Sequence, residues 1–150
     1  MALREFPADA LDEELIPGFM TFRMLHRHIL ESSHALTGLL LDGAQEFNKP
    51  ETRAKFGNYL PVIPADASTE DLIEALQTKL EERATRIASQ GNAFWEREVT
   101  HFSGTKMTAF DMFLMIQKHE AEHRAQAALL SRIKGIVPAT TRRRLAAQAR

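Results

Sequence analysis

The stretch TAFDMFLMIQKHEAEHRAQAALLSRIKG, residues 108–135, has the strongest helical pattern in the chain and carries two histidines four positions apart. Thr108 followed by Asp111 is typical of a helix N-cap, and Gly135 supplies a stop. Residues four apart on a helix lie one turn apart on the same face. His119 and His123 can therefore bind one transition-metal ion together.

Both histidines fall within the apolar stripe of this predicted helix. The residues within about 80° of His119 on a helical wheel are Met112, Met115, Ile116, His123, Ala127 and Leu130. We therefore expect the two imidazoles to face the interior of a bundle, where their nitrogens need partners. A metal ion would satisfy both. The alternative is a pair of buried histidines that hydrogen-bond to carboxylates or to the backbone.

The letters H-E-x-x-H also match the motif of zinc peptidases, in which Glu120 would act as the general base. A catalytic zinc ion normally has three protein ligands and a water. Residues 124–150 contain no Asp, Glu, His or Cys, so a third ligand would have to come from upstream. This departure from the usual motif disfavours a peptidase.

Two other segments show the periodicity of long helices, residues 19–41 and residues 68–90. Their apolar stripes are Phe22, Leu25, Ile29, Leu36 and Leu40 in the first segment and Ile73, Leu76, Leu80, Ala84 and Ile87 in the second. Ser68 with Asp71 predicts an N-cap, and Gly91 predicts a stop. The pattern indicates an all-α antiparallel bundle.

The remaining segments are less regular. We expect short helices around residues 8–15 and at Pro50, a packed connection over residues 92–107, and no β-strand. We assign residues 1–138 to a single bundle domain. Residues 139–150 would form an Arg-rich tail or short helix, and we interpret its arginines as a solvated or dimer-packing surface rather than a nucleic-acid site.

Composition narrows the possible functions. The chain has 150 residues, 44% of them apolar and 26% charged, with a formal net charge of -1, which is typical of one globular domain. It has no cysteine, so a nucleophilic sulfur would have to come from a small thiol. The N-terminus lacks the pattern of a secretion signal and no apolar run suits a membrane span. We expect a cytoplasmic protein that binds neither membrane nor nucleic acid.

A third imidazole for the His119 and His123 pair would come from the segment 19–41, which contains His26, His28 and His34. By periodicity alone His26 lies nearest the apolar stripe, whereas His28 lies to one side of it and His34 further around the other side. Periodicity therefore does not choose among them. We expect His101, which lies on a connection, to be a surface residue.

Two segments resemble a known family. The segment LMIQKHEAEHRAQ, residues 114–126, resembles the last-helix signature of the DinB-like superfamily, in which His and three residues precede His-Arg-Gly-Gln; Ala125 stands in place of the Gly. The segment TFRMLHRHILES, residues 21–32, resembles the family's second helix, where a His followed by an aliphatic residue and an acid is the first metal ligand. This match selects His28. The resemblance covers most of the chain and is weakest at the N-terminus.

The resemblance implies a DinB-like up-and-down helical bundle, a four-helix bundle whose first helix is shortened. It also implies a three-histidine site, His28, His119 and His123, for a divalent metal ion: nickel, zinc or iron. The superfamily includes bacillithiol- and mycothiol-dependent enzymes. The hypothesis is therefore a metal-dependent thiol transferase or hydrolase acting on a small-molecule substrate with a low-molecular-weight thiol. We expect a homodimer, because three amphipathic helices rarely cover their own apolar faces.

Two alternatives stay open at this point. The first is a non-catalytic dimeric protein, stress-related or a scaffold, with the same bundle. The second is a carboxylate di-iron bundle, because Glu31 precedes His34 and Glu120 precedes His123 at Glu-x-x-His spacing. It is disfavoured, because the stripe of residues 68–90 contains no Glu.

Three polar residues beside the histidine pair have more than one interpretation. Glu120 and Glu122 would orient a ligand or pair with Arg124 and Lys118 on the surface. Gln126 would orient a ligand or pack against a partner.

Overall fold

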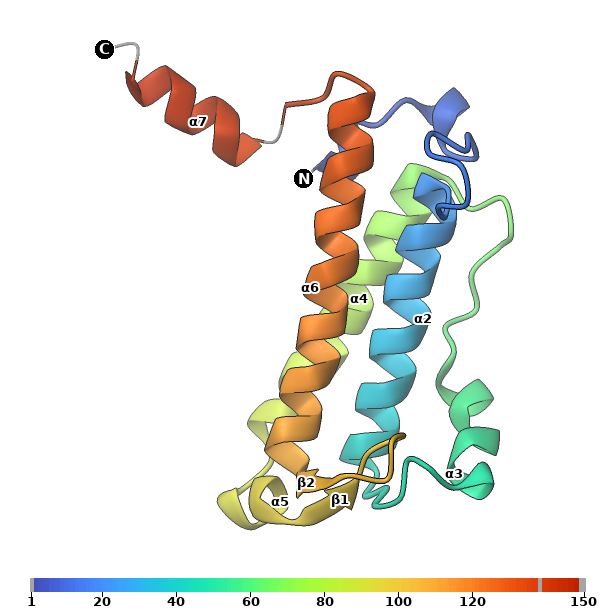
Figure 1. Cartoon of the computed structure of the whole chain (residues 1–150), viewed down its shortest axis with the longest axis vertical. Helices are drawn as coiled ribbons and strands as arrows, with labels where there is room; N and C mark the ends of the chain where they lie inside the picture. The colour runs from blue at the N-terminus through green and yellow to red at the C-terminus, as the bar shows by residue number, and fades with distance from the viewer. Residues whose placement is uncertain (1, 138, 149–150) are drawn as a thin grey trace.

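The computed structural model describes residues 2–137 and 139–148, and its core is a bundle of three long helices (Figure 1). These are α2 (Phe22–Leu41), α4 (Thr69–Ala88) and α6 (Ala109–Ile133), and α2 packs against both of the others. The shorter elements are α1 (Ala2–Glu5), α3 (Pro50–Ala54), α5 (Asn92–Glu96), α7 (Ala139–Gln148), 3-10 turns at Ala8–Ala10 and Phe56–Tyr59, and strands β1 (Glu98–Thr100) and β2 (Lys106–Thr108). The predicted all-α bundle is confirmed.

The long helices begin at the predicted caps. The hydroxyl of Ser68 accepts a hydrogen bond from the backbone N–H of Asp71, whose carboxylate accepts one from the N–H of Ser68. Thr108 and Asp111 form the same capping box at the start of α6. α6 ends at Ile133, and Gly135 adopts a φ of 77° that favours glycine.

The N-terminal prediction needs a correction. The helix expected over residues 8–15 is only a 3-10 turn, and α1 has four residues. Pro7 fixes an extended backbone immediately before this turn, so α1 and the turn cannot join into one helix. The segment still packs well, since Phe6 stacks on Phe22 with 3.7 Å between ring centroids. The first helix of the bundle is therefore shortened, as predicted.

The connection from α3 to α4 runs back along α2 in extended form (Figure 1). Two arginines of α2 hold it in place. Arg27 donates to the carbonyl oxygens of Ile63 and Pro64, and Arg23 donates to that of Ala67. These hydrogen bonds satisfy backbone carbonyl groups that have no partner in a helix or sheet, because the connection contains prolines and is extended.

A small β-hairpin precedes α6, whereas the sequence predicted no strand. β1 and β2 are antiparallel, with Val99 opposite Met107. Thr100 also exchanges backbone hydrogen bonds with the segment after α2, donating to Gln45 and accepting from Phe47. Each strand has three residues, which is too short for an alternating pattern to be recognised in sequence.

The core consists of two apolar clusters at opposite ends of the bundle. One includes Leu25, Ile29 and Leu130, and the other includes Leu40 and Met112. On α6, His119 and His123 fall between the two clusters, whereas His28 lies on α2 within the span of the first cluster, between Leu25 and Ile29. The packing of both ends thus fixes how the two helices face each other at the histidines.

α7 extends away from the bundle (Figure 1), and Arg142 ties its first turns to Glu5 of α1. Pro138, which sequence analysis used as a stop, lies outside the described residues, and the domain boundary at 138 stays a prediction. Within residues 2–137 and 139–148, no helix has both the length and the apolar character needed to cross a bilayer.

Candidate metal centre

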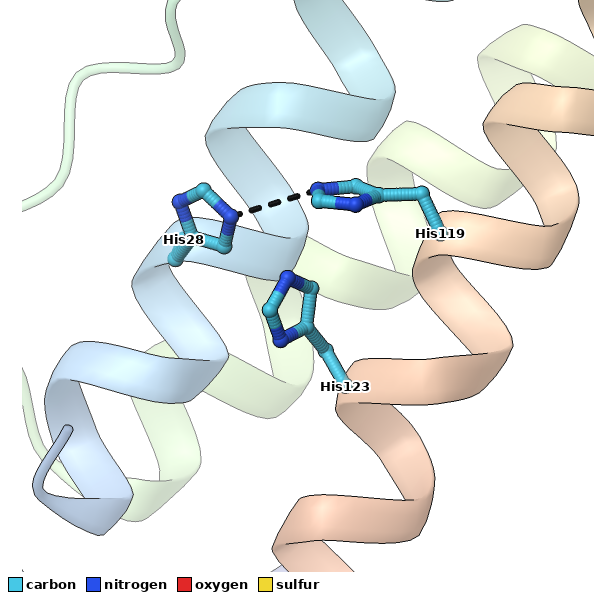
Figure 2. A group of neighbouring side chains, drawn as sticks. All are labelled: His28, His119 and His123. Carbon is cyan, nitrogen blue, oxygen red and sulfur yellow. Dashed lines mark hydrogen bonds between the residues drawn. The ribbon is translucent and has the colours of Figure 1, made fainter. Parts of the chain in front are cut away.

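Three histidines from two antiparallel helices converge on one point. His28 extends from α2, and His119 and His123 extend from successive turns of α6 (Figure 2). Nε2 of His28 lies 3.3 Å from Nε2 of His119. One ring nitrogen from each residue lies within 4.8 Å of the others. The three residues predicted as metal ligands are therefore neighbours in the structure.

The rings face each other edge to face rather than stacking. The centroid of the His123 ring lies 4.6 Å from that of His28 and 4.4 Å from that of His119, with nearly perpendicular planes. The rings of His28 and His119 are also arranged edge to face, with 5.4 Å between their centroids.

Electrostatics favours the neutral imidazoles that metal ions need. Burial, followed by the neighbouring His123 and His119, lowers the pKa of His28. Burial, followed by His123, lowers the pKa of His119. Both rings are therefore unprotonated near neutral pH, as metal ligands must be.

Neighbouring polar groups hold the cluster in position. Nδ1 of His123 lies 2.8 Å from Oε1 of Gln126, so the protonated Nδ1 donates to this amide oxygen and leaves Nε2 as the free nitrogen. On α2, the hydroxyl of Ser32 donates to the backbone carbonyl of His28. Gln126 thus has the ligand-orienting position that was one of its two predicted roles.

The geometry fits a divalent transition-metal ion. Two nitrogens bound at about 2.0–2.1 Å with tetrahedral angles lie roughly 3.4 Å apart, close to the 3.3 Å between His28 and His119. Zinc, nickel and iron all accept imidazole ligands. Three side-chain ligands leave room for water or substrate, which is the pattern of a catalytic rather than a structural site.

The other histidines of α2 lie elsewhere. His26 is buried, and its Nδ1 donates to the carbonyl of Phe22, 2.8 Å away. His34 lies near Lys79, Glu82 and Arg83 of α4. Neither belongs to the cluster, so the histidine of α2 that lies beside His119 and His123 is His28, the one that the family match selected.

The carboxylates required for a di-iron site are not assembled. Among the described residues, the only cluster of potential metal-ligating side chains consists of the three imidazoles. Glu120 forms the predicted ion pair with Arg124 and a second one with Arg83 of α4, but at 5% exposed it is buried rather than on the surface. Glu31 pairs with Arg27.

A cavity of about 410 Å³ opens beside the cluster. His119 and Glu122 lie in its wall; the other lining residues are Leu36, His101, Phe102, Met112, Met115, Ile116 and Lys118. Met115, predicted to face the interior, is 41% exposed here. The volume is sufficient for a small organic molecule.

His101 is the residue that sequence analysis missed at this site. It was expected on the surface, but it is half-buried and lines the cavity together with His119. Its Nδ1 accepts a hydrogen bond from the backbone N–H of Ser103, so the neutral ring carries its proton on Nε2. No local signal could have revealed this, because the hairpin places His101 beside α6 only through tertiary contacts.

The all-α bundle and its cluster of three histidines make this protein a candidate metal-binding helical protein. A family model described as the DinB superfamily matches residues 1–127. The chain therefore belongs to the DinB superfamily, as its motifs predicted. Among curated proteins no significant relative was found.

Two solved structures share the fold. One is a DinB-like protein from Bacillus subtilis, 18% identical, with a TM-score of 0.70 over 91% of this chain and 84% of that chain. The other is a mutant of a mycothiol-dependent maleylpyruvate isomerase, 16% identical, with a TM-score of 0.56. The match covers 85% of this chain and 52% of the isomerase, so this chain spans about half of that enzyme.

Proposed function

We propose that His28, His119 and His123 bind one divalent metal ion, nickel, zinc or iron, and that the protein is a metal-dependent thiol transferase or hydrolase. The convergence of three imidazoles in Figure 2 is the observation that carries the metal site. The lowered pKa values of His28 and His119 support it, because neutral imidazoles bind metal without first losing a proton.

Elemental analysis of untagged protein purified without chelator tests the site. We expect about one equivalent of metal in the wild type, and loss of it in His28→Ala and His119→Ala. His34→Ala is the matched control, since His34 is on α2 but outside the cluster. No metal in the wild type, and no uptake when nickel, zinc or iron is supplied, would overturn the proposal. About two equivalents of iron would support the carboxylate alternative.

The proposed chemistry follows from the site and from the absence of cysteine. When bound, a divalent ion held by three imidazoles lowers the pKa of a coordinated water or thiol. The chain itself has no thiol, so a sulfur nucleophile would come from a low-molecular-weight thiol. The fold is shared with a mycothiol-dependent enzyme, which supports this class of co-substrate.

Residues of the cavity would position the reactants. His101 holds a proton on Nε2 at the wall shared with His119, from which it can hydrogen-bond a substrate oxygen. Phe102, Met112 and Ile116 supply apolar contacts that exclude water. Lys118 provides a cation at the rim for an anionic group of the thiol or substrate.

A thiol and electrophile screen tests the activity. Metal-loaded wild type, His119→Ala and His101→Gln would be compared with a panel of low-molecular-weight thiols and activated electrophiles, and with ester and amide substrates. We expect turnover that requires metal and falls in both variants, while His101→Gln retains its metal. Full metal occupancy without any turnover would support a non-catalytic scaffold instead.

We also propose that the protein forms a homodimer. Several large apolar side chains on α6 remain exposed, namely Phe110, Leu114, Leu129 and Ile133, and each is 45% to 49% exposed. Exposed apolar side chains along one helix favour association with a second copy. Light scattering after size-exclusion chromatography tests this, and a monomer at all concentrations would contradict it.

A further inference from the structure

A second cavity lies on a different face of α6 from the histidine cluster. It has a volume of about 320 Å³ and is bounded by α2, α4 and α6, with Leu3 of α1 at its wall. Glu120, Arg124 and Ala128 lie about 100° to 180° around α6 from His119 by helix geometry. The two cavities share no lining residue, so the second is independent of the proposed metal site.

The cavity is mostly apolar. Its lining residues are Leu3, His26, Ile29, Leu76, Gln77, Leu80, Arg83, Glu120, Arg124, Ala127 and Ala128. The two adjacent alanines leave space where larger side chains would fill the groove between α4 and α6. Leu3, at 1% exposed, is fixed in the core, whereas Leu80, at 54% exposed, lies at the solvent side. The cavity thus has an apolar body and an accessible mouth.

The charged side chains that line this cavity carry a net charge of plus one. Arg83 and Arg124 both bind Glu120, Arg83 to Oε2 at 3.2 Å and Arg124 to Oε1 at 2.5 Å. Two guanidinium groups remain charged at any physiological pH, so the three residues carry a net charge of plus one. Burial lowers the pKa of His26, so His26 adds no charge near neutral pH.

The two arginines differ in access to solvent. The side chain of Arg83 is 11% exposed, and its Nε has no hydrogen-bond partner among the described residues. The side chain of Arg124 is 65% exposed, so only part of its hydrogen-bonding capacity is used by Glu120. Arg124 therefore places an available cation at the mouth, beside the apolar interior.

We infer that this cavity binds an amphipathic carboxylate, a medium-length alkyl chain whose anionic end pairs with Arg124 at the mouth. The alkyl chain would contact Ile29, Leu76 and Leu80 and lie over the small surface of Ala127 and Ala128. At about 30 Å³ for each group of the size of a water molecule, the volume suits roughly ten carbon atoms. The net positive charge of Arg83, Arg124 and Glu120 thus favours an anion over a cation of equal length.

Titration calorimetry with decanoate below its micelle concentration tests the inference. We expect one site, with affinity rising about fourfold for each methylene between octanoate and decanoate. Decyltrimethylammonium, which has the opposite charge, should bind more weakly than decanoate. Absence of decanoate binding, or equal binding of the two amphiphiles, would overturn the inference.

Variants locate the ligand. Ala128→Phe fills the cavity and should abolish binding, whereas Ala125→Phe, on an exposed position of the same helix, should leave it unchanged. Arg124→Ala should weaken binding about fivefold, the effect expected of an exposed ion pair. Leu80→Asp keeps the core intact and places a repelling carboxylate at the mouth, so it should also weaken binding even if Ala128→Phe does not fold.

Two experimental outcomes would show that decanoate does not occupy this cavity. Decanoate binding that is lost in His119→Ala but retained in Ala128→Phe and Leu80→Asp would place the ligand at the histidine site. A wild-type dimer that excludes decanoate, and that dissociates in Leu80→Asp, would show that a second copy occupies the groove. Either result would overturn the inference without affecting the metal measurement.

Discussion

Nδ1 of His123 and Oε1 of Gln126 lie 2.8 Å apart, one turn along α6. The hydrogen bond fixes which nitrogen carries the proton and so directs the free Nε2 toward His28 and His119. Partners of this kind commonly change metal affinity when they are removed, because the imidazole then reorients and becomes a weaker base.

Gln126→Leu should therefore weaken binding of zinc or nickel by about tenfold or more. Competition with a chromophoric chelator measures the dissociation constant. Gln126→Glu, which keeps an acceptor at this position, should retain most of the affinity. Gln117→Leu, on the same helix, is the control. Equal affinities in Gln126→Leu and the wild type would show that the bond does not orient the ring.

We expect Glu120 to contribute more to the free energy of unfolding than its partner Arg124 does. Glu120→Ala leaves the nearly buried Arg83 without its anion, and removal of one partner of a buried pair costs about 3–5 kcal/mol. Arg124→Ala removes a mostly exposed partner and should cost less than about 1 kcal/mol. Urea unfolding measures both free energies. A similar small cost for both variants would mean that Arg83 finds water when Glu120 is absent.

Gly38 lies inside α2 under the ring of Tyr59, where an added Cβ would overlap the ring carbons. Alanine usually stabilises a helix interior relative to glycine by roughly 0.5–1 kcal/mol. Here overpacking should reverse the sign, and Gly38→Ala should destabilise the protein by about 1–3 kcal/mol. In the background Tyr59→Ala the same change should become stabilising. Thermal unfolding of the four proteins tests this, and additive effects would contradict it.

His26 should make the protein less stable in mild acid. Burial holds its pKa below the ordinary value of 6.5, so the unfolded chain binds a proton before the folded chain does. The stability is complete above about pH 6.5 and is lost as the pH falls through the window down to the folded-state pKa. His26→Phe, which keeps an aromatic ring against Phe22, should flatten this part of the profile. Urea titrations from pH 5 to 8 measure it, and an unchanged slope would count against His26.

The sequence predicted the long helices well because their signals are local. Capping residues such as Ser68 and Thr108 and the apolar stripes depend on neighbours within one or two turns. The N-terminal segment was predicted as a longer helix because its apolar residues, such as Leu11, are buried by tertiary contacts rather than by a helical face. The hairpin was missed because each of its strands has only three residues, too few to show an alternating pattern.

Part of the candidate site was also predictable, because two of its histidines are close together in sequence. His119 and His123 are one turn apart, so a single helix brings them together. His28 is ninety-one positions from His119, and only the resemblance selected it over His26. His101 reaches the site because α5 and the hairpin pack against α6, and Glu120 meets Arg83 of α4 through a side-chain ion pair. No local pattern in this chain encodes either contact.

In the hairpin before α6, the residues that anchor the segment to the bundle differ from those that line the cavity. Backbone hydrogen bonds to Gln45 and Phe47 anchor it to the bundle, while residues 101–105 form its turn and present His101 and Phe102 to the cavity. Changes in that turn can alter which molecules enter without disturbing the helices that hold the histidines. If the cavity binds substrate as proposed, substitutions in this turn would change substrate specificity, and redesign of specificity would begin there.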